Sequence, residues 1–538
     1  MSTHNQVLDQ LYAKYDGVIA SGERVPFVYP WGAFGALLVL LYLLVPHHNS
    51  PFLRLLRYPV WALNAYISLY TIMHCRARNS APAFGVGLIS SWSILWTATI
   101  MIVHDAQNDF QRIERTEGAV SSSLKKMQNG GPKQMRGLRP VTTIKDIDYA
   151  AEQKRLGTKA GPTHRKGKFA WQHYPLHPFA ERLDWVADVF CNFRGMGWNW
   201  RISGLAPPPE WVQKELAEES GAQISDKDTH LGADGTHRYH TRRECLRAAL
   251  KSFVVGYLTL DLLKVIVTLD PYFWGHIDSP APTWLPAIVR SSPVLTTIWR
   301  LSISLAAVKT ALVTIFSMGP LFFVGLLGTD WIGARGEPWM YPDTYGSFRM
   351  VLDKGLAGWW GGWWHQTFRF AFAAPSKRII ATLGMNPKSM PARTLQLIIA
   401  FTLSGCLHAS GSYTMVGHTN PLTGPFSFFF SQAFGIMLQT FLTGILTKTG
   451  IFQKTPKLIR QIVNFFYVHV WFYYTGPLLC DDFARGGLWL FEPVPVSPLR
   501  ALGFGDADSK WWCWGMREGA DWFRWHTGEH WWHSGLAT

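Results

Sequence analysis

The sequence predicts an all-α, polytopic membrane protein with about eight transmembrane helices and additional re-entrant or interfacial helices. Two observations predict this class. Of the 538 residues, 48% are hydrophobic, and they gather into blocks long enough to cross a bilayer, which takes roughly 20 residues of helix. The 27 tryptophans are several-fold more than usual and are typical of the aromatic belts at membrane interfaces.

Eight apolar segments are candidate spans. The first is short enough to lie in the interface instead, and the segment with residues 359–372 is treated separately below because it is rich in charges and aromatic rings. The predicted spans are residues 31–45, 52–73, 84–103, 250–269, 299–327, 395–416, 426–446 and 462–480.

Composition divides the chain into five regions. Residues 1–30 are a polar tail without the apolar run of a cleavable signal peptide, so the first membrane helix is expected to act as the targeting signal. Residues 31–103 hold the N-terminal transmembrane helices, and residues 104–250 form a basic loop with an interfacial element, RGMGWNW. Residues 251–480 form the transmembrane core that holds the candidate catalytic residues, and residues 481–538 form a Trp-rich interfacial tail.

Charge and cysteine content limit the partners. The formal net charge is +15, so the polar parts favour anionic partners such as lipid headgroups or nucleotide phosphates. Nucleic acid is not expected, because no basic helix or aromatic-basic module stands apart from the apolar blocks. The six cysteines are widely separated, which indicates neither a disulfide framework nor a metal site.

A single histidine, His408, lies near the middle of LQLIIAFTLSGCLHASGSYTMV, residues 395–416. An ionisable group inside an apolar helix is costly and marks a site or a pathway. The small residues around it allow another helix, or a ligand, to approach the backbone closely. A histidine that only packs between helices is the alternative interpretation, and this segment alone does not favour either.

A second segment combines dense aromatic rings with polar groups. It reads WWGGWWHQTFRFAF, residues 359–372, and contains His365, Gln366 and Arg369. On a helix, His365 and Arg369 would share one face with Phe372. The segment is too aromatic for a solvent-exposed helix and too charged for a lipid-facing one, so we expect a re-entrant or interfacial element beside a buried site. The two histidines could then meet within the membrane.

Two imidazoles in a water-poor site favour acyl transfer to an alcohol. Histidine has a pKa near neutrality and can act as a general base, and excluding water protects an activated acyl donor from hydrolysis. We expect His408 to take the hydroxyl proton, while His365, Gln366 or a backbone amide stabilises the oxyanion or orients the acceptor. No serine or cysteine lies in a G-x-S-x-G pattern, so direct transfer is predicted.

Other polar residues in the apolar segments have simpler interpretations. Asp261 and Lys264 are expected to neutralise each other on one helical face. Two alternatives to an enzyme of this kind are a transporter or receptor without chemistry, disfavoured by the lack of an internal repeat, and a haem protein. The histidines that could ligate haem are His74, His104, His418 and His469.

Four motifs resemble the membrane-bound O-acyltransferase superfamily, in its wax-synthase-like branch common in fungi. They are RGMGWNW (194–200), YLTLDLLKVIVTLDPYFWG (257–275), WWGGWWHQTFR (359–369) and SGCLHASGSY (404–413). The branch's invariant membrane histidine falls on His408, and its upstream Asn-or-His position falls on His365. One departure is Gly362, which stands where the family often has a basic residue.

The resemblance implies helices around a central tunnel, with acetyl-CoA as co-substrate from the cytosol, a lipophilic alcohol as acceptor, and neither a bound cofactor nor a metal. It implies an enzyme of the endoplasmic-reticulum membrane that acetylates a terpenoid or meroterpenoid alcohol in secondary metabolism. Wax-ester or sterol-ester synthesis from a long-chain acyl-CoA is the alternative. Beside the catalytic His408 and His365, the substrate-binding candidates are Gln366, Arg369, Trp364, Ser404, Arg194 and Trp198.

Overall fold

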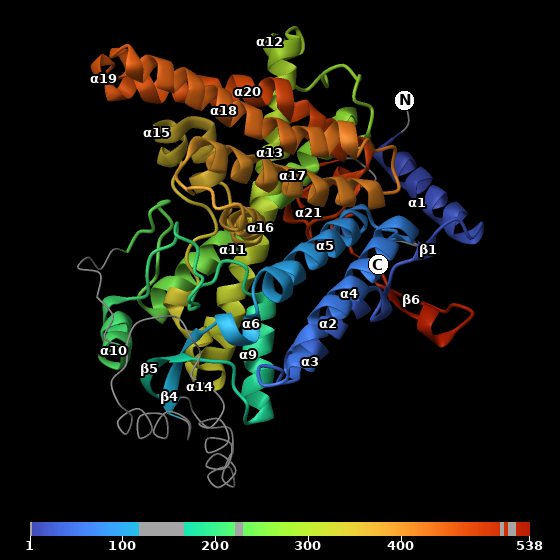
Figure 1. The fold of residues 1–538 in the computed structure, drawn as a ribbon. Coiled ribbons are helices and arrows are strands. Elements are labelled where there is room, and N and C mark those ends of the chain that lie inside the picture. Colours follow the sequence, from blue (N-terminus) through green and yellow to red (C-terminus); the bar gives the residue numbers. More distant parts are fainter. Residues whose placement is uncertain (1–2, 118–165, 221–229, 506–509, 515–522) are drawn as a thin grey trace, which may run out of the picture.

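The computed structural model describes residues 3–117, 166–220, 230–505, 510–514 and 523–538. Of the predicted basic loop, residues 104–250, the segments 118–165 and 221–229 lie outside these ranges. The described chain is mainly helical (Figure 1). The longer helices are α1 (His4–Ala20), α2 (Phe34–Leu44), α4 (Arg57–His74), α5 (Ser80–Ala98), α9 (Phe179–Cys191), α10 (Glu210–Ser220), α11 (Arg242–Thr268), α13 (Pro293–Pro320), α15 (Arg349–Gly358), α16 (Arg369–Thr382), α17 (Met390–Thr414), α18 (Ser427–Lys448) and α20 (Lys457–Arg485).

Shorter elements connect these helices. Four of them are π-helical segments that continue or precede a longer helix: η2 (Thr99–Val103), η5 (Leu321–Leu327), η8 (Trp359–Trp363) and η9 (Leu422–Phe426). The short helices are α3 (Pro51–Leu55), α6 (Ala106–Asp109), α12 (Ala287–Arg290), α14 (Gly328–Ile332), α19 (Ile451–Lys454), α21 (Pro498–Ala501), η1 (Trp31–Ala33), η4 (Pro271–Trp274), η6 (Gly333–Gly336), η7 (Pro338–Met340), η10 (Leu488–Leu490) and η11 (Trp531–His533).

The strands are short and form three small sheets. β1 (Val25–Pro26) pairs in parallel with β3 (Cys75–Arg76), and β4 (Arg112–Glu117) pairs antiparallel with β5 (Lys166–Gln172). β7 (Gly535–Ala537) lies between β2 (Val28–Tyr29) and β6 (Arg524–His526), antiparallel to both. The last strand therefore joins the two ends of the described chain.

Each of the eight predicted spans coincides with a helix, namely α2, α4, α5, α11, α13, α17, α18 and α20. Four segments are long and apolar enough to cross a membrane: Ser80–Val103, Pro293–Gly336, Met390–Thr414 and Leu422–Lys448. Large apolar side chains such as Phe441 on α18 and Phe466 on α20 are exposed, as expected of surfaces that face lipid. The helical class is confirmed, while the number of about eight spans remains a prediction.

The predicted regions do not follow the ends of the helices. Within the polar tail, residues 4–20 form helix α1, because Thr3 and Gln6 make a capping box at its start and Tyr15 is buried. The expected boundaries at residues 250/251 and 480/481 fall inside α11 and α20. A change in composition along a helix does not end that helix when its backbone hydrogen bonds continue.

Helix α17, which carries His408, crosses α5 at very short range. A Cβ atom on Gly87 of α5 would lie 1.9 Å from the carbonyl oxygen of Ser410. Beside this contact the Thr414 hydroxyl donates to the Ala83 carbonyl at 2.7 Å, and it accepts from the Gly87 N–H at 3.0 Å. The small residues around His408 thus allow the close helix approach that the sequence predicts.

The prediction that Asp261 and Lys264 pair with each other is wrong, because each side chain binds other groups. The Asp261 carboxylate accepts from the hydroxyl of Ser497 and, at 2.9 Å, from the N–H of Leu499. Lys264 Nζ instead donates to the carbonyl of Trp489 at 2.9 Å. Both charged groups on α11 therefore anchor the segment that follows α20, where the backbone supplies the partners that a buried charge requires.

A buried ion pair gives the first testable prediction. Arg300 on α13 donates to both carboxylate oxygens of Asp270, at 3.1 and 3.0 Å, and the two side chains are 8% and 0% exposed. Because Arg300→Met would leave an unpaired buried carboxylate, we expect it to lower the free energy of unfolding by about 3 kcal/mol. Thermal unfolding in detergent measures this loss.

The matched control is Arg24→Met, since Arg24 pairs with Glu23 at 3.7 Å at the surface, where the Glu23 side chain is 62% exposed. Exposed pairs contribute little, so this variant should unfold like the wild type. Adding Asp270→Asn to Arg300→Met should recover part of the loss, because no isolated charge then remains buried. Equal unfolding temperatures for Arg300→Met and the wild type would contradict the prediction.

Candidate active site

The hydrogen bond of His408 fixes which of its ring nitrogens can accept a proton. Nδ1 lies 2.8 Å from the carbonyl oxygen of Ser404, one helical turn earlier on α17. Because a carbonyl oxygen only accepts, Nδ1 carries the hydrogen and Nε2 keeps its lone pair in the neutral ring. The ring stacks on Phe429 of α18, with centroids 4.0 Å apart. His408 is therefore held in the orientation and tautomer of a general base.

His365 lies where the chain breaks between η8 and α16. Its ring packs edge-on against Phe368 and Tyr345, at centroid distances of 5.7 and 6.1 Å, and its Nδ1 is buried without a hydrogen-bond partner among the described residues. The pKa of His365 lies well below its ordinary value because burial disfavours the imidazolium, and because His408 and Arg194 add repulsion. The two histidines are thus within electrostatic reach of each other.

The predicted common helical face of His365 and Arg369 is wrong. Trp364 is extended, with φ −67° and ψ 144°, and α16 begins only at Arg369. The side chain of Arg369 turns back and donates to the backbone carbonyl of Gly361 at 2.9 Å and to the side-chain oxygen Oε1 of Gln366 at 3.0 Å. The helix is interrupted between Trp363 and Arg369, so His365 and Arg369 do not lie on one helical face. The spacing of residues in the sequence assumes a continuous helix and does not reveal such a break.

The side chain of Gln366 binds neighbouring protein groups, and its contact with substrate remains a prediction. Its amide nitrogen donates to the backbone carbonyls of Trp360 and Trp364, at 2.8 and 2.5 Å, while its oxygen accepts from Arg369. The side chain is thereby engaged at both ends. It compensates carbonyl groups that lose their helical partners where η8 ends, and so it holds the loop on which His365 lies.

Arg194 supports a neighbouring loop, the one that precedes α15 and contains Tyr345. Its guanidinium donates to the carbonyls of Asp343 and Pro342, at 2.7 and 2.9 Å. Burial lowers the pKa of Arg194 to about 10, and the carboxylates of Asp234 and Asp343 partly offset this shift. Of the motif around residues 194–200, Arg194 is the residue whose charge reaches His365.

Trp198 lies in a core rather than at a surface. It is 2% exposed and packs edge-on against Trp185 of α9, with centroids 5.0 Å apart. The motif was expected as an amphipathic element at the membrane surface, but the Gly197 carbonyl accepts from the N–H of Ile113 in β4, and Met196 is also buried. The motif is covered because α9, which directly precedes it, and β4, which lies about 80 residues earlier in the chain, pack over it.

The last two predicted residues lie beside the histidines. Trp364 directly precedes His365, and its ring lies parallel to that of Trp359 at a centroid distance of 6.3 Å. Ser404 is buried, and it is its backbone carbonyl that contacts His408. Trp364 therefore borders His365 through its ring, and Ser404 contacts His408 through its backbone carbonyl rather than its hydroxyl.

Sequence reasoning missed three residues around the histidines. Phe429 supports the His408 ring, Tyr345 borders the His365 ring, and Gly346 donates its N–H to the Trp363 carbonyl at 3.0 Å. Phe429 is one of many apolar residues in its helix, and the other two lie in an irregular loop. The sequence carries no periodic signal that would have identified them.

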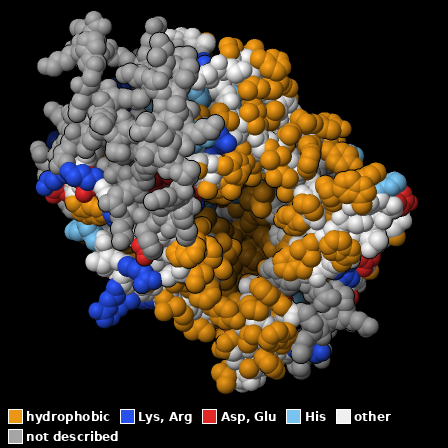
Figure 2. Space-filling view, turned by 90° about the horizontal axis from the view of Figure 1, so that it is seen from below, with side chains coloured by type: hydrophobic (Ala, Val, Ile, Leu, Met, Phe, Trp, Pro, Cys, Tyr) orange, Lys and Arg blue, Asp and Glu red, His pale blue; other side chains and the backbone are white. Residues whose placement is uncertain are grey.

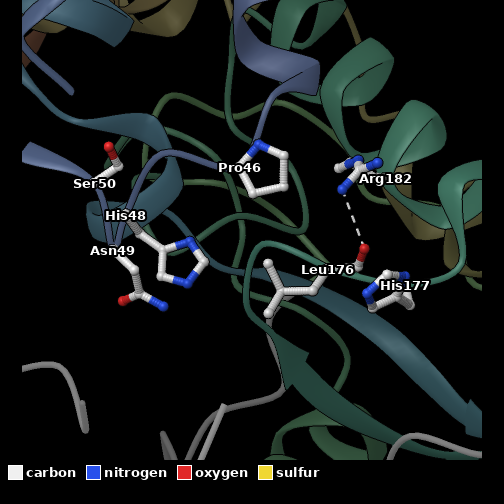
Figure 3. A pocket seen from close by; sticks show the side chains of 7 residues that line it. All are labelled: Pro46, His48, Asn49, Ser50, Leu176, His177 and Arg182. Atoms are coloured by element: carbon white, nitrogen blue, oxygen red, sulfur yellow. Dashed lines mark hydrogen bonds between the residues drawn. The ribbon is translucent and has the colours of Figure 1, made fainter. Parts of the chain in front are cut away.

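A surface pocket lies apart from these residues (Figure 3). It has a volume of about 340 Å³ and is lined by Pro46, His48, Asn49, Ser50, Leu176, His177 and Arg182. Arg182 donates to the Leu176 carbonyl at its rim. None of the predicted site residues lines it. Within the described residues, no three histidine, cysteine or acidic side chains gather as ligands of a metal would.

The sequence of residues 341–431 matches the model of the Membrane bound O-acyl transferase family, and this segment contains both histidines. The resemblance predicted from the motifs is therefore confirmed for this part of the chain. No solved structure matches the chain.

Curated fungal proteins are similar over a longer region. O-Mevalon transferase yanI of Aspergillus niger is 25% identical over 309 residues, which are 55% of this chain and 61% of that protein. Acetyltransferase ple2 of Rhodocybe pseudopiperita is 27% identical over 301 residues, 55% of this chain and 65% of that protein. Acetyltransferase cdmC of Talaromyces verruculosus is 24% identical over 59% of this chain and 69% of its own length. The chain spans less than two thirds of the first two relatives.

Two glycines beside the site give a matched pair of variants. A Cβ atom on Gly346 would lie 2.3 Å from the Gly362 carbonyl oxygen and 2.5 Å from that of Asp234, whereas one on Gly361 would meet nothing within 4 Å. Because the Gly362 carbonyl cannot move away without shifting the segment that leads to His365, we expect Gly346→Ala to lower acyl transfer at least tenfold and Gly361→Ala to leave it unchanged.

Transfer assays on membranes with equal protein content measure both variants. Thermal unfolding in detergent shows whether Gly346→Ala is still folded. Similar activity of the two variants would mean that the contact of Gly346 does not position the loop.

Proposed function

We propose that this protein is an integral-membrane O-acyltransferase that moves an acetyl group from acetyl-CoA to a hydroxyl group of a terpenoid or meroterpenoid alcohol. The observation that carries the proposal is the fixed tautomer of His408, whose Nε2 lone pair is available beside a second, neutral histidine. The match of residues 341–431 to the family and the names of the similar fungal proteins support the same reaction class.

The reaction needs one proton transfer and one exchange of bonds. His408 Nε2 takes the hydroxyl proton while the alcohol oxygen forms a bond to the thioester carbon. The tetrahedral intermediate then expels the thiolate of CoA as the carbon–sulfur bond breaks, and the imidazolium of His408 returns its proton to that sulfur. His365 orients the hydroxyl or stabilises the oxyanion through its unused ring nitrogen. The ester and free CoA leave.

Aromatic side chains around the two rings keep water out. His408 stacks on Phe429, and His365 lies among Tyr345, Trp364 and Phe368. Such surroundings protect the thioester from hydrolysis and strengthen hydrogen bonds to developing charge. They also favour a lipophilic acceptor, and Figure 2 shows a hollow lined with hydrophobic side chains on one face of the molecule. A central tunnel would open through such a surface.

The acetyl donor is favoured over a long-chain donor by two of the three relatives described above, ple2 and cdmC, which carry the name acetyltransferase, while yanI carries the name O-Mevalon transferase. Transfer of a long acyl chain, giving a wax ester or a sterol ester, is the second candidate within the same chemistry. The apolar helices favour a membrane location, and the family resemblance favours the endoplasmic reticulum, with acetyl-CoA arriving from the cytosol and the alcohol from the bilayer.

Replacing the proposed base tests the mechanism. We expect His408→Ala to lower ester formation about 10²–10⁴-fold, since a positioned general base contributes this much, and His365→Ala to weaken it strongly. The assay uses microsomes with radiolabelled acetyl-CoA or long-chain acyl-CoA and a panel of terpenoid and fatty alcohols. Acetyl esters formed only by the intact protein would establish class and donor, whereas long-chain esters would overturn the donor.

His469 on α20 provides the control. Its Nδ1 bonds the Phe465 carbonyl at 2.7 Å and its ring packs on Phe465, as His408 does with Ser404 and Phe429, but His469 is exposed. His469→Ala should retain full activity because this ring has no partner histidine. Equal activity of His408→Ala and the wild type would remove His408 from the mechanism.

A further inference from the structure

Lys309 is a charged residue in the interior of α13. It lies 16 residues after Pro293 and 11 before Pro320, roughly 24 Å and 16 Å along the helix axis, so its side chain reaches neither end of the helix. The surrounding segment, Pro293–Gly336, is apolar and long enough to span a membrane. A lysine at this depth is costly unless a partner compensates its charge.

Two aromatic rings are the groups that face the ammonium. Lys309 Nζ lies 5.5 Å from the ring centroid of Tyr345 and 5.5 Å from that of Trp363. Ring faces attract a cation but do not accept its three N–H bonds as an oxygen does. Within the described part of the chain, Lys309 forms neither a hydrogen bond nor an ion pair.

The aromatic wall beside Lys309 is also a wall of the active site. The ring of Tyr345 packs edge-on against His365, with centroids 6.1 Å apart, and against Trp364 at 5.4 Å. The Tyr345 hydroxyl is buried without a hydrogen-bond partner, and burial raises the pKa of Tyr345, which keeps the hydroxyl protonated. Two unused donors, one of them charged, therefore lie next to the proposed reacting groups.

We propose that Lys309 and Tyr345 form a recognition subsite for a carboxylate on the acceptor alcohol. This inference rests on the proposed function and adds the chemical class of the acceptor, a hydroxy acid. A carboxylate supplies the oxygen atoms that the ammonium lacks, and Tyr345 places it one ring away from His365. The hydroxyl of the same molecule then reaches His408.

The acetyl donor does not fit this subsite. The phosphates of CoA carry several charges, whereas a single lysine lies at this depth, and the pantetheine arm that reaches the histidines offers neutral amides. A phospholipid headgroup does not fit either, because it stays at the membrane surface. The single positive charge thus matches a single anionic group on a lipophilic molecule.

A binding experiment that does not require turnover tests the subsite. The full-length protein in nanodiscs is titrated with tritiated 12-hydroxydodecanoate and with its methyl ester, and empty nanodiscs correct for partition into lipid. The wild type should bind the acid about tenfold more tightly than the ester, as expected for a charge-assisted hydrogen bond. Lys309→Met should remove this preference, Lys309→Arg should retain most of it, and Tyr345→Phe should reduce it.

Lys448→Met is the matched control, because Lys448 lies exposed at the end of α18, and it should keep the preference. Equal binding of acid and ester by the wild type, or a preference that survives Lys309→Met, would overturn the subsite. Acetyl transfer from acetyl-CoA is measured in parallel. Preferential binding without transfer would leave the subsite standing and refute the proposed function, and transfer without the preference would do the reverse.

Discussion

A backbone group that leaves its helical partner in an apolar environment needs another partner, and the site depends on how this chain meets that requirement. The break after η8 frees the carbonyls of Trp360, Trp363 and Trp364. The side-chain amide of Gln366 donates hydrogen bonds to the carbonyls of Trp360 and Trp364, and the N–H of Gly346 donates to that of Trp363. These bonds stabilise the unwound chain at His365, whose ring packs against Tyr345 and Phe368. The polar residues of this motif thus serve mainly its backbone.

Local patterns in the sequence predicted the apolar helices and one of the two candidate catalytic histidines, His408. The apolar segments became helices because length and hydrophobicity are properties of each segment by itself. His408 was identifiable for the same reason, since an ionisable residue in an apolar helix stands out without knowledge of its neighbours. The small residues near it foretold the close crossing of α5 and α17, which the Gly87 contact confirms.

What the sequence could not predict depends on contacts between distant segments. Arg369 was expected beside His365 on a helix, but the helix breaks between them. Trp198 was expected in an interfacial element, but it is 2% exposed, and the strand β4, about 80 residues earlier in the chain, pairs with this motif. His469 repeats the Nδ1 hydrogen bond of His408 to the carbonyl four residues earlier and still lies exposed, with its ring on Phe465 of its own helix. In each case the sequence identifies the residue but does not show which other segments of the chain pack around it.

The anchoring of the C-terminal segment by α11 has a consequence for biosynthesis. Lys264 and its carbonyl partner are 225 residues apart, and Asp261 and Ser497 are 236 residues apart. Since the ribosome delivers the chain from its N-terminus, α11 emerges before Trp489, Ser497 and Leu499, which bind its two charged groups. His4, whose Nε2 lies 3.3 Å from Lys264 Nζ, is the earlier partner of Lys264. The helix bundle is complete only when the segment after α20 binds the two charged side chains of α11.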